Sequence, residues 1–480
     1  MRVGQAMAWT VCLVCLAMLV ACADTKPRVV VQSSMEIRHY RLPNGLEVIL
    51  HPDPSFRNVV VNVRYDTGSR EDPRGQEGLA HLVEHLTFRR VLGPPKSPPT
   101  SPVDDAGLDA AAEEQASRAT PRAETLGTVE NEISSNYNAF TSLDATEYHM
   151  VVAPDDLPMA LWLEAQRMRA PLAGLTEEQF DTERSVVRNE TRQRDENAPY
   201  GNVGATLVRA AFPDGHPYHT AFVSAERELE GATLASATAF TREHYRAANA
   251  TLVVGGRFDV GEAARLVLGT LGALPSTPPR PIVEHALRPI EGGVELVMEA
   301  GVDSAMYAKA WLVPPAGHAG HLEAHLLARL LEGHVFVAGR EGELARVRAG
   351  VWSGRLGALL IISVELRAGL QPSVGRARVI EGINTLLDAD EPPSTWGAIK
   401  SGVIAEHAFD MEHLDERATR FQDDVTIFGE PDVFQPLLHA FTRVRYVDVL
   451  ASAHALLRRR HGVGLYVYPV AGAPRGGRAR

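Results

Sequence analysis

The order of apolar and polar residues predicts that strands and helices alternate along most of the chain. Apolar and polar residues alternate on both sides of Pro43-Asn44-Gly45, which is typical of a β-hairpin. The stretch 58–68 is rich in β-branched residues and predicts a strand, whereas apolar residues recur at helical spacing over 157–168. By the same criteria, 76–90 and 260–275 are predicted helices, and 147–154 and 249–259 are predicted strands.

A second half repeats this order in outline after a proline-rich joint at 274–289. Two halves of about 200 residues each are a plausible size for domains. The fold class is therefore expected to be α+β, with two similar halves that each pack helices on a sheet. In the second half, strands are expected at 292–301, 304–314, 356–369 and 462–470, with a helix at 321–336 and two further helical stretches before the last strand.

The first 22 residues are expected to be a targeting segment. They combine an early arginine with an apolar run and small residues, the layout of a secretory signal peptide. The ending Leu19-Val20-Ala21-Cys22 resembles the lipobox of bacterial lipoproteins, which makes Cys22 the expected site of lipidation. The protein is then expected to be exported and anchored on a membrane surface, on the periplasmic face of the outer membrane. The alternative is an ordinary signal peptide with a chance cysteine.

The remaining boundaries follow from shifts in composition. A stretch rich in proline, alanine, serine and acidic residues directly follows the helix of the first half and is predicted to be an inserted surface loop. The expected segments are a polar leader (23–34), the first half (35–273) with its insertion (93–124), the linker (274–289), the second half (290–470) and a loose tail (471–480).

Charge and cysteine content exclude several kinds of function. The formal net charge is −12, so no strong basic field predicts nucleic-acid binding, and no nucleic-acid partner is expected. All three cysteines lie within residues 1–22. The body of the protein therefore has no thiol for a disulfide, a cysteine-ligated metal or a cysteine nucleophile.

The sequence His81-Leu-Val-Glu84-His85 is the strongest candidate for chemistry. On a helix, His81 and His85 lie on one face at positions i and i+4, with Glu84 beside them. Two neutral imidazoles so placed can bind one Zn²⁺, and an adjacent carboxylate can take a proton from water. The alternative is a helix whose histidines only hydrogen-bond locally.

Zinc needs a third protein ligand, and the polar helical stretch 175–197 offers two candidates in Glu183 and Glu190. Glu183 and Glu190 are seven residues apart, two turns along one face. Without further context, glutamates on an acidic helix are usually a solvated face.

Several segments together resemble the pitrilysin family of zinc metallopeptidases, the inverzincins, which includes insulysin and the mitochondrial processing peptidase. The motif helix is similar in "GLAHLVEHLTF", and the glutamate helix in "TERSVVRNE". "NAFTSLDATEYHMVV" resembles the family's Asn-Ala-x-Thr strand and its continuation. The likeness is strong over 35–275 and holds in outline over 285–470. It implies two related α+β halves that form half of a clamshell-like peptidase.

The resemblance implies a role for each residue of the motifs. His81, His85 and Glu190 are the implied ligands of one Zn²⁺ per chain. Glu84 is the implied general base that activates the metal-bound water, with Glu183 as a supporting acidic residue. Glu190 follows His85 by 190 − 85 = 105 residues, which is longer than is usual in the family, and the insertion 93–124 accounts for the surplus.

The implied substrate is a peptide or an unfolded protein segment. Asn138 and Ala139 would lie on an edge strand that pairs with the backbone of an extended peptide. The family's second half usually adds an arginine and a tyrosine that steady the substrate. The corresponding stretch 340–357 has Arg346 and Arg348 but no tyrosine, and Trp352 stands near the expected place.

Two functions therefore remain open. The first is an exported zinc endopeptidase, in which a homodimer or a related family chain as partner completes the site. The second is a non-catalytic subunit that binds peptides or supports a catalytic partner, since a fold alone does not fix function. A further pair, His321 and His325, lies in "HLEAH", where the glutamate at i+2 points away from the histidine face. We predict that this helix is the structural counterpart of the motif helix and not a second metal site.

Overall fold

The computed structural model describes residues 35–92, 124–220, 227, 229–278, 292–409, 411–457 and 461–470. The expected signal segment (1–22), polar leader (23–34) and tail (471–480) lie outside the described residues, as do nearly all of the insertion 93–124 and most of the linker after Pro278. In the described part of the chain, no helix is both long and apolar enough to span a bilayer.

The first half contains a six-stranded sheet in the order β1-β2-β6-β3-β5-β4. The predicted hairpin forms β1 and β2, with Arg41 opposite Glu47. Most neighbouring strands are antiparallel, but β2 and β6 run parallel. The strands are β1 (Arg38–Arg41), β2 (Glu47–Pro52), β3 (Val59–Tyr65), β4 (Ser134–Thr141), β5 (Thr146–Val152) and β6 (Ala250–Gly256).

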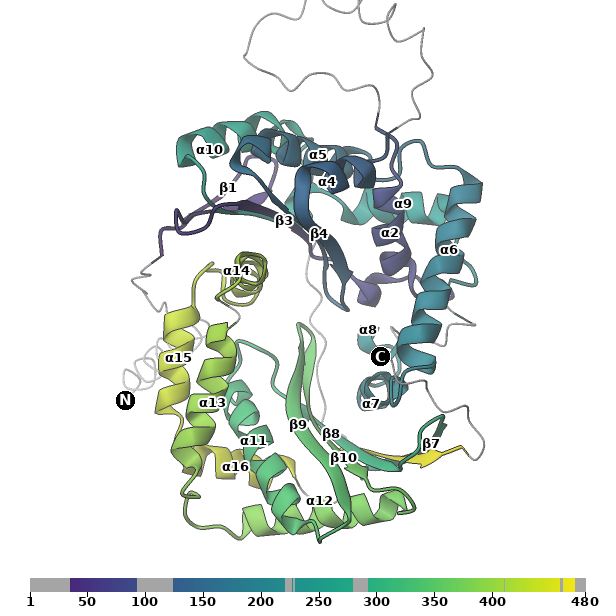
Figure 1. The fold of residues 1–480 in the computed structure, drawn as a ribbon, viewed down its shortest axis with the longest axis vertical. Helices are drawn as coiled ribbons and strands as arrows, with labels where there is room; N and C mark the ends of the chain where they lie inside the picture. The colour runs from purple at the N-terminus through teal and green to yellow at the C-terminus, as the bar shows by residue number, and fades with distance from the viewer. Residues whose placement is uncertain are drawn as a thin grey trace, which may run out of the picture.

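One face of this sheet packs on helices through a continuous apolar core. In Figure 1, α4, α5 and α10 of the first half lie above the sheet, and α6 runs down one side of the molecule. The helices are α2 (Leu79–Phe88), α4 (Leu126–Ile133), α5 (Leu157–Arg169), α6 (Glu177–Thr191), α7 (Asn202–Ala211), α8 (Pro217–Thr220), α9 (Leu234–His244) and α10 (Val260–Gly269), with short helical turns at Ser69–Glu71, Pro154–Asp156, Arg192–Glu196, Ala247–Asn249 and Leu271–Ala273.

The second sheet repeats the topology of the first. Its order is β7-β11-β8-β10-β9, with β7 and β11 parallel and the other pairs antiparallel. This matches β2-β6-β3-β5-β4, so the expectation of two similar α+β halves is confirmed. The strands are β7 (Val294–Ala300), β8 (Met306–Val313), β9 (Leu344–Gly354), β10 (Gly357–Leu366) and β11 (Val463–Pro469).

The second half differs from the sequence prediction in two respects. Strand β9 was not predicted, although apolar and arginine side chains alternate along it. Five helices, not two, lie between β10 and β11, because short turns divide the long polar stretch into separate amphipathic pieces. The helices of this half are α11 (His321–Ala338), α12 (Pro372–Leu387), α13 (Trp396–Phe409), α14 (Leu414–Phe428), α15 (Phe434–Arg443) and α16 (Tyr446–Leu456).

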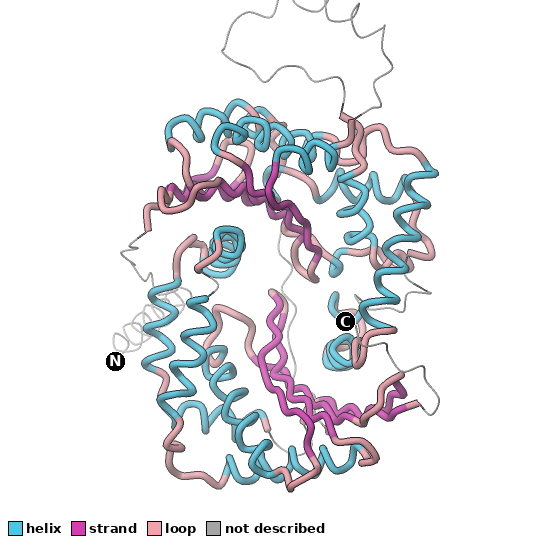
Figure 2. The backbone as a smooth tube through the Cα atoms, in the orientation of Figure 1, coloured by secondary structure: helices cyan, strands magenta, loops and turns pink. Residues whose placement is uncertain are grey.

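Each half contributes one helix that packs on the sheet of the other half. The sheets face each other, most helices lie on their outer faces, and α14 and α7 lie in the space between (Figure 2). Helix α14 belongs to the second half, but its Leu414 and Phe421 pack on Ile49 and Val60 of the first sheet. In return, α7 of the first half packs on the inner face of the second sheet. Each sheet is thus covered on its inner face by a helix from the other half.

Candidate metal centre

Helix α2 presents the two motif histidines from a buried and well-anchored position. Asp72 accepts hydrogen bonds from the backbone N–H groups of Gly78, at 2.7 Å, and Ala80, at 2.8 Å, which satisfies the first turn of the helix. Leu79, Ala80, Leu82, Val83 and Leu86 are fully buried, so the opposite face carries the histidines.

The structure brings the motif residues together with Glu183 and Glu190 of α6. Side-chain ligand atoms of His81, Glu84 and His85 lie within 4.8 Å of one another. Glu190 Oε2 lies 3.7 Å from His81 Nε2 and 3.4 Å from His85 Nε2. Two atoms bound to one tetrahedral zinc are roughly 3.3 Å apart, so two imidazoles and one carboxylate are already close to the spacing that the ion requires.

Glu183 lies behind His85. Its Oε2 is 3.4 Å from His85 Nδ1, while its Oε1 accepts a hydrogen bond from Arg89 Nε at 2.7 Å. The ring of His85 is therefore fixed between Glu183 on one nitrogen and Glu190 on the other. This arrangement orients a metal-binding imidazole and makes it a stronger ligand.

The electrostatic environment favours a cation at this position. Burial and the adjacent His85 lower the pKa of His81 to about 3, so this imidazole is neutral and able to bind a metal. Burial alone would also lower the pKa of His85, but the hydrogen bond to Glu183 and the charges of Glu84 and Glu190 outweigh it and raise the pKa. The same negative charges would attract a divalent ion.

Glu84 is buried and held by strand β4. Burial raises the pKa of Glu84 above its usual value, and the hydrogen bond from Thr141 opposes this in part. Thr141 Oγ1 donates that bond to Glu84 Oε2 at 2.5 Å. A glutamate with a raised pKa is suited to accept a proton near neutral pH. Neither Thr141 nor Arg89 was predicted from the sequence to be part of this site.

Asn138 and Ala139 lie on β4, the outermost strand of the first sheet. Ala139 packs toward the core, whereas Asn138 is exposed. Strand β4 pairs with β5 on one side only, and no side chain among the described residues is hydrogen-bonded to its outer backbone over 136–140. This edge lies next to Glu84 and is open.

The second half places its candidate residues on the other edge strand. Arg346, Arg348 and Trp352 lie on β9. The nearest acidic partner of Arg346 is Glu365, at 3.8 Å, and the Trp352 ring lies 5.6 Å from the Tyr218 ring. No described tyrosine lies on this strand.

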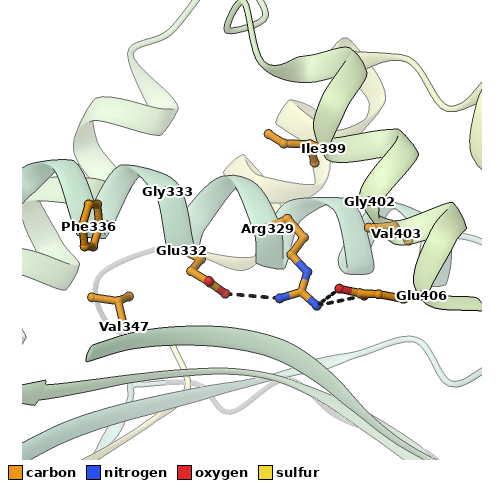
Figure 3. Close-up of a pocket in the computed structure, with 9 residues that line it drawn as sticks. All are labelled: Arg329, Glu332, Gly333, Phe336, Val347, Ile399, Gly402, Val403 and Glu406. Atoms are coloured by element: carbon orange, nitrogen blue, oxygen red, sulfur yellow. Dashed lines mark hydrogen bonds and ion pairs between the residues drawn. The ribbon is translucent and has the colours of Figure 1, made fainter. Parts of the chain in front are cut away.

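A cavity of about 450 Å³ in the second half does not coincide with the metal centre (Figure 3). It lies beside α11, α13 and β9, and none of its lining residues belongs to the histidine cluster. Within it, Arg329 pairs with Glu406 at 2.7 and 2.9 Å. Glu332 accepts the N–H of Ala349 at 2.8 Å, and Arg329 donates to the Ala349 carbonyl at 3.3 Å. These two side chains cover the middle of the β9 edge.

The chain is similar in sequence to known protein families and to individual proteins. Residues 47–98 and 115–220 match the family described as Insulinase (Peptidase family M16), and residues 231–349 match the Peptidase M16 inactive domain. The zinc protease PqqE of Helicobacter pylori is 26% identical over 294 residues, which are 60% of this chain and 60% of that protein. The mitochondrial-processing peptidase subunit beta of Blastocladiella emersonii is 25% identical over 49% of this chain and 44% of its own.

Solved structures share the fold of nearly the whole chain. A protease from Helicobacter pylori superimposes with a TM-score of 0.75 at 20% identity, covering 91% of this chain and all of its own. Pitrilysin superimposes with a TM-score of 0.67 at 18% identity, covering 93% of this chain and 46% of its own. The matched regions of the two sequence relatives span only about half of their lengths.

Proposed function

Because this chain belongs to the M16 peptidase family, we propose that it is a zinc-dependent endopeptidase that cleaves peptides or unfolded protein segments. The observation that carries the proposal is the convergence of His81, His85 and Glu190 at 3.4–3.7 Å beside the buried Glu84. Relatives named as zinc proteases support the choice of metal.

In the proposed site, His81, His85 and Glu190 hold one Zn²⁺ per chain. The ion supplies Lewis-acid polarisation of water and of the scissile carbonyl. Glu84 accepts the proton from water as general base and later passes it to the leaving amine. Thr141 fixes the orientation of this carboxylate, and Glu183 fixes the ring of His85.

The substrate is proposed to bind as an added strand on β4. This edge is open and ends at Thr141, which contacts Glu84, so a peptide paired with Asn138 and Ala139 would run past the site. The edge of β9 is covered at Ala349 by Glu332 and Arg329 and is a poorer template. Backbone pairing would allow the site to accept extended chains of many sequences.

The alternative is a non-catalytic subunit that binds peptides or supports a partner. Two observations favour it: the match of residues 231–349 to an inactive domain, and the absence of a described tyrosine on β9. Several similar chains are parts of assemblies, including a mitochondrial-processing peptidase subunit and a Candida albicans complex III chain. A second copy or a related chain is accordingly the proposed partner.

Export is a separate proposal that rests on residues 1–22 alone. It predicts that Cys22 carries acyl chains and that Cys22→Ala moves the protein from the detergent phase to the aqueous phase in phase-partition assays. A wild-type protein that stays in the aqueous phase would contradict the anchor.

Hydrolysis of a fluorogenic unfolded protein tests the peptidase. Zinc-loaded wild type should cleave it, whereas Glu84→Gln should retain zinc and lose at least about 10³-fold in kcat, because general-base and electrostatic contributions are both removed. If neither protein cleaves while both bind zinc, the subunit alternative is correct.

A further inference from the structure

Two hairpin turns, one from each half, meet at a largely buried contact between the halves. Strands β4 and β5 are joined by the turn 142–145, and β9 and β10 are joined by Arg355 and Leu356. The contact between these turns centres on Asp144 and Tyr218. Tyr218, on α8, is fully buried.

The carboxylate of Asp144 accepts hydrogen bonds from both halves. Tyr218 Oη donates to both carboxylate oxygens, at 2.7 Å each, and Arg70 donates to Oδ1. From the second half, the backbone N–H of Arg355 donates to Oδ2 at 2.8 Å. A partly buried carboxylate that accepts this many hydrogen bonds has a fixed position.

Tyr218 connects the two turns by hydrogen bonds to both. Its hydroxyl accepts the N–H of Leu356 at 2.9 Å while donating to Asp144. The ring lies directly on Gly354 at the end of β9, where a Cβ would come within 2.5 Å of Tyr218 Oη. Arg355 also reaches across to Asp66 at 3.1 Å. The β9–β10 turn is thus docked on the β4–β5 turn with no room for a side chain at residue 354.

The β4–β5 turn lies next in sequence to Thr141, which is hydrogen-bonded to Glu84. Ser142 N donates to Ala145 O at 2.8 Å, which closes the turn that holds Asp144. Thr141, the last residue of β4, precedes this turn and donates to Glu84. Only Ser142 and Leu143 therefore lie between Asp144, which makes the contact between the halves, and Thr141, which orients the proposed general base.

We propose that Tyr218 and Asp144 are positioning residues through which the second half fixes the orientation of Glu84, by way of Thr141. This inference rests on the proposed peptidase activity. By this proposal, catalysis requires the second half even though that half supplies no metal ligand.

The test uses the zinc-loaded full chain and a fluorogenic unfolded substrate. Tyr218→Phe removes only the hydroxyl. We expect kcat to fall about 10- to 100-fold with KM within about twofold, because displacement of a catalytic group by about an ångström has effects of this size. Tyr200→Phe is the matched control, since the Tyr200 hydroxyl also forms a hydrogen bond between the halves, here by donating to Ser304 O at 2.7 Å, but at a different place. It should leave kcat and KM unchanged.

A double-mutant cycle tests the route. If Tyr218 acts through Thr141, adding Tyr218→Phe to Thr141→Val should change kcat by less than about twofold, because one pathway is already broken. Additive effects would overturn the route. Unchanged kcat in Tyr218→Phe, with active wild type, would overturn the positioning role alone. Inactive wild type with bound zinc would overturn the peptidase proposal and this role with it.

Stability is measured alongside, so that a structural effect is recognised. A merely structural role would lower Tm and the folded fraction without changing kcat per folded, zinc-loaded molecule. Asp144→Asn, which keeps the size of the side chain, is the second variant should Tyr218→Phe fail to fold. It should also lower kcat at unchanged KM.

Discussion

Helices α2 and α11 are counterparts in the two halves and carry histidine pairs with almost the same geometry. Each begins after a glycine with positive φ, Gly78 at 92° and Gly320 at 91°. The rings of His81 and His85 are 5.0 Å apart at 83°, and those of His321 and His325 are 4.8 Å apart at 74°. The spacing of two imidazoles on a helix therefore does not distinguish the halves.

The surrounding carboxylates do distinguish them. His85 is adjacent to Glu84, Glu183 and Glu190, and its pKa is raised. In the second half, His325 Nε2 contacts His321 Nε2 at 3.2 Å, and His321 Nδ1 bonds the Pro314 carbonyl at 2.8 Å. Burial, His321, His407 and Arg329 lower the pKa of His325 to about 3. The first pair has the negative field that a metal ion requires, and the second pair is satisfied without one.

Removing a carboxylate from the first site should have the largest effect on zinc. Glu190→Gln should weaken zinc binding more than about 100-fold, because a structural zinc site of four ligands is worth roughly 10–16 kcal/mol and each ligand contributes a share. Competition with a chromogenic chelator measures this. The neighbouring exposed Glu178→Gln is the control and should bind zinc as the wild type does.

Lowering the pH should destabilise the folded protein through His325 of the second pair. The folded-state pKa of His325 lies below its unfolded value, so the stability it contributes above about pH 6.5 is lost as pH falls toward about 3. Between pH 7 and pH 4 this loss is on the order of 3 kcal/mol. His325→Gln should therefore lose less unfolding free energy than the wild type over this range in denaturant titrations. Equal losses would show that His325 is not held neutral.

A smaller effect is expected when the orienting glutamate is changed. Glu183→Gln keeps a hydrogen-bond acceptor for Arg89 but removes the charge beside His85. Zinc affinity should fall about 10- to 100-fold, the usual effect of a group that orients a ligand. Unchanged zinc affinity would mean that Glu183 serves only to pair with Arg89.

The sequence was sufficient for the features that depend on local pattern. The HLVEH spacing on a helix, the seven-residue spacing of Glu183 and Glu190, and the alternation that predicted β1 and β2 all follow from periods of 3.6 and 2 residues. The insertion also explained the long separation of His85 and Glu190. These spacings supplied the candidates, and the resemblance to the pitrilysin family selected His81, Glu84, His85 and Glu190 among them.

Features that depend on contacts between distant segments were not predictable in this way. Asp144 meets Tyr218 and Arg355 across 74 and 211 residues, and nothing in the local sequence of these residues marks them as partners. The same is true of α14, whose apolar face fits the sheet of the other half. Strand β9 was missed because its arginines made an exposed edge look like a polar loop.

Zinc stoichiometry of the purified protein tests the central comparison most directly. After loading and exhaustive dialysis, we expect about one zinc per chain in wild type, none in His85→Ala and one in His325→Ala, because three carboxylates lie beside the first histidine pair alone. Two zinc ions in wild type, or loss of zinc in His325→Ala, would contradict the account and place a second metal site on α11.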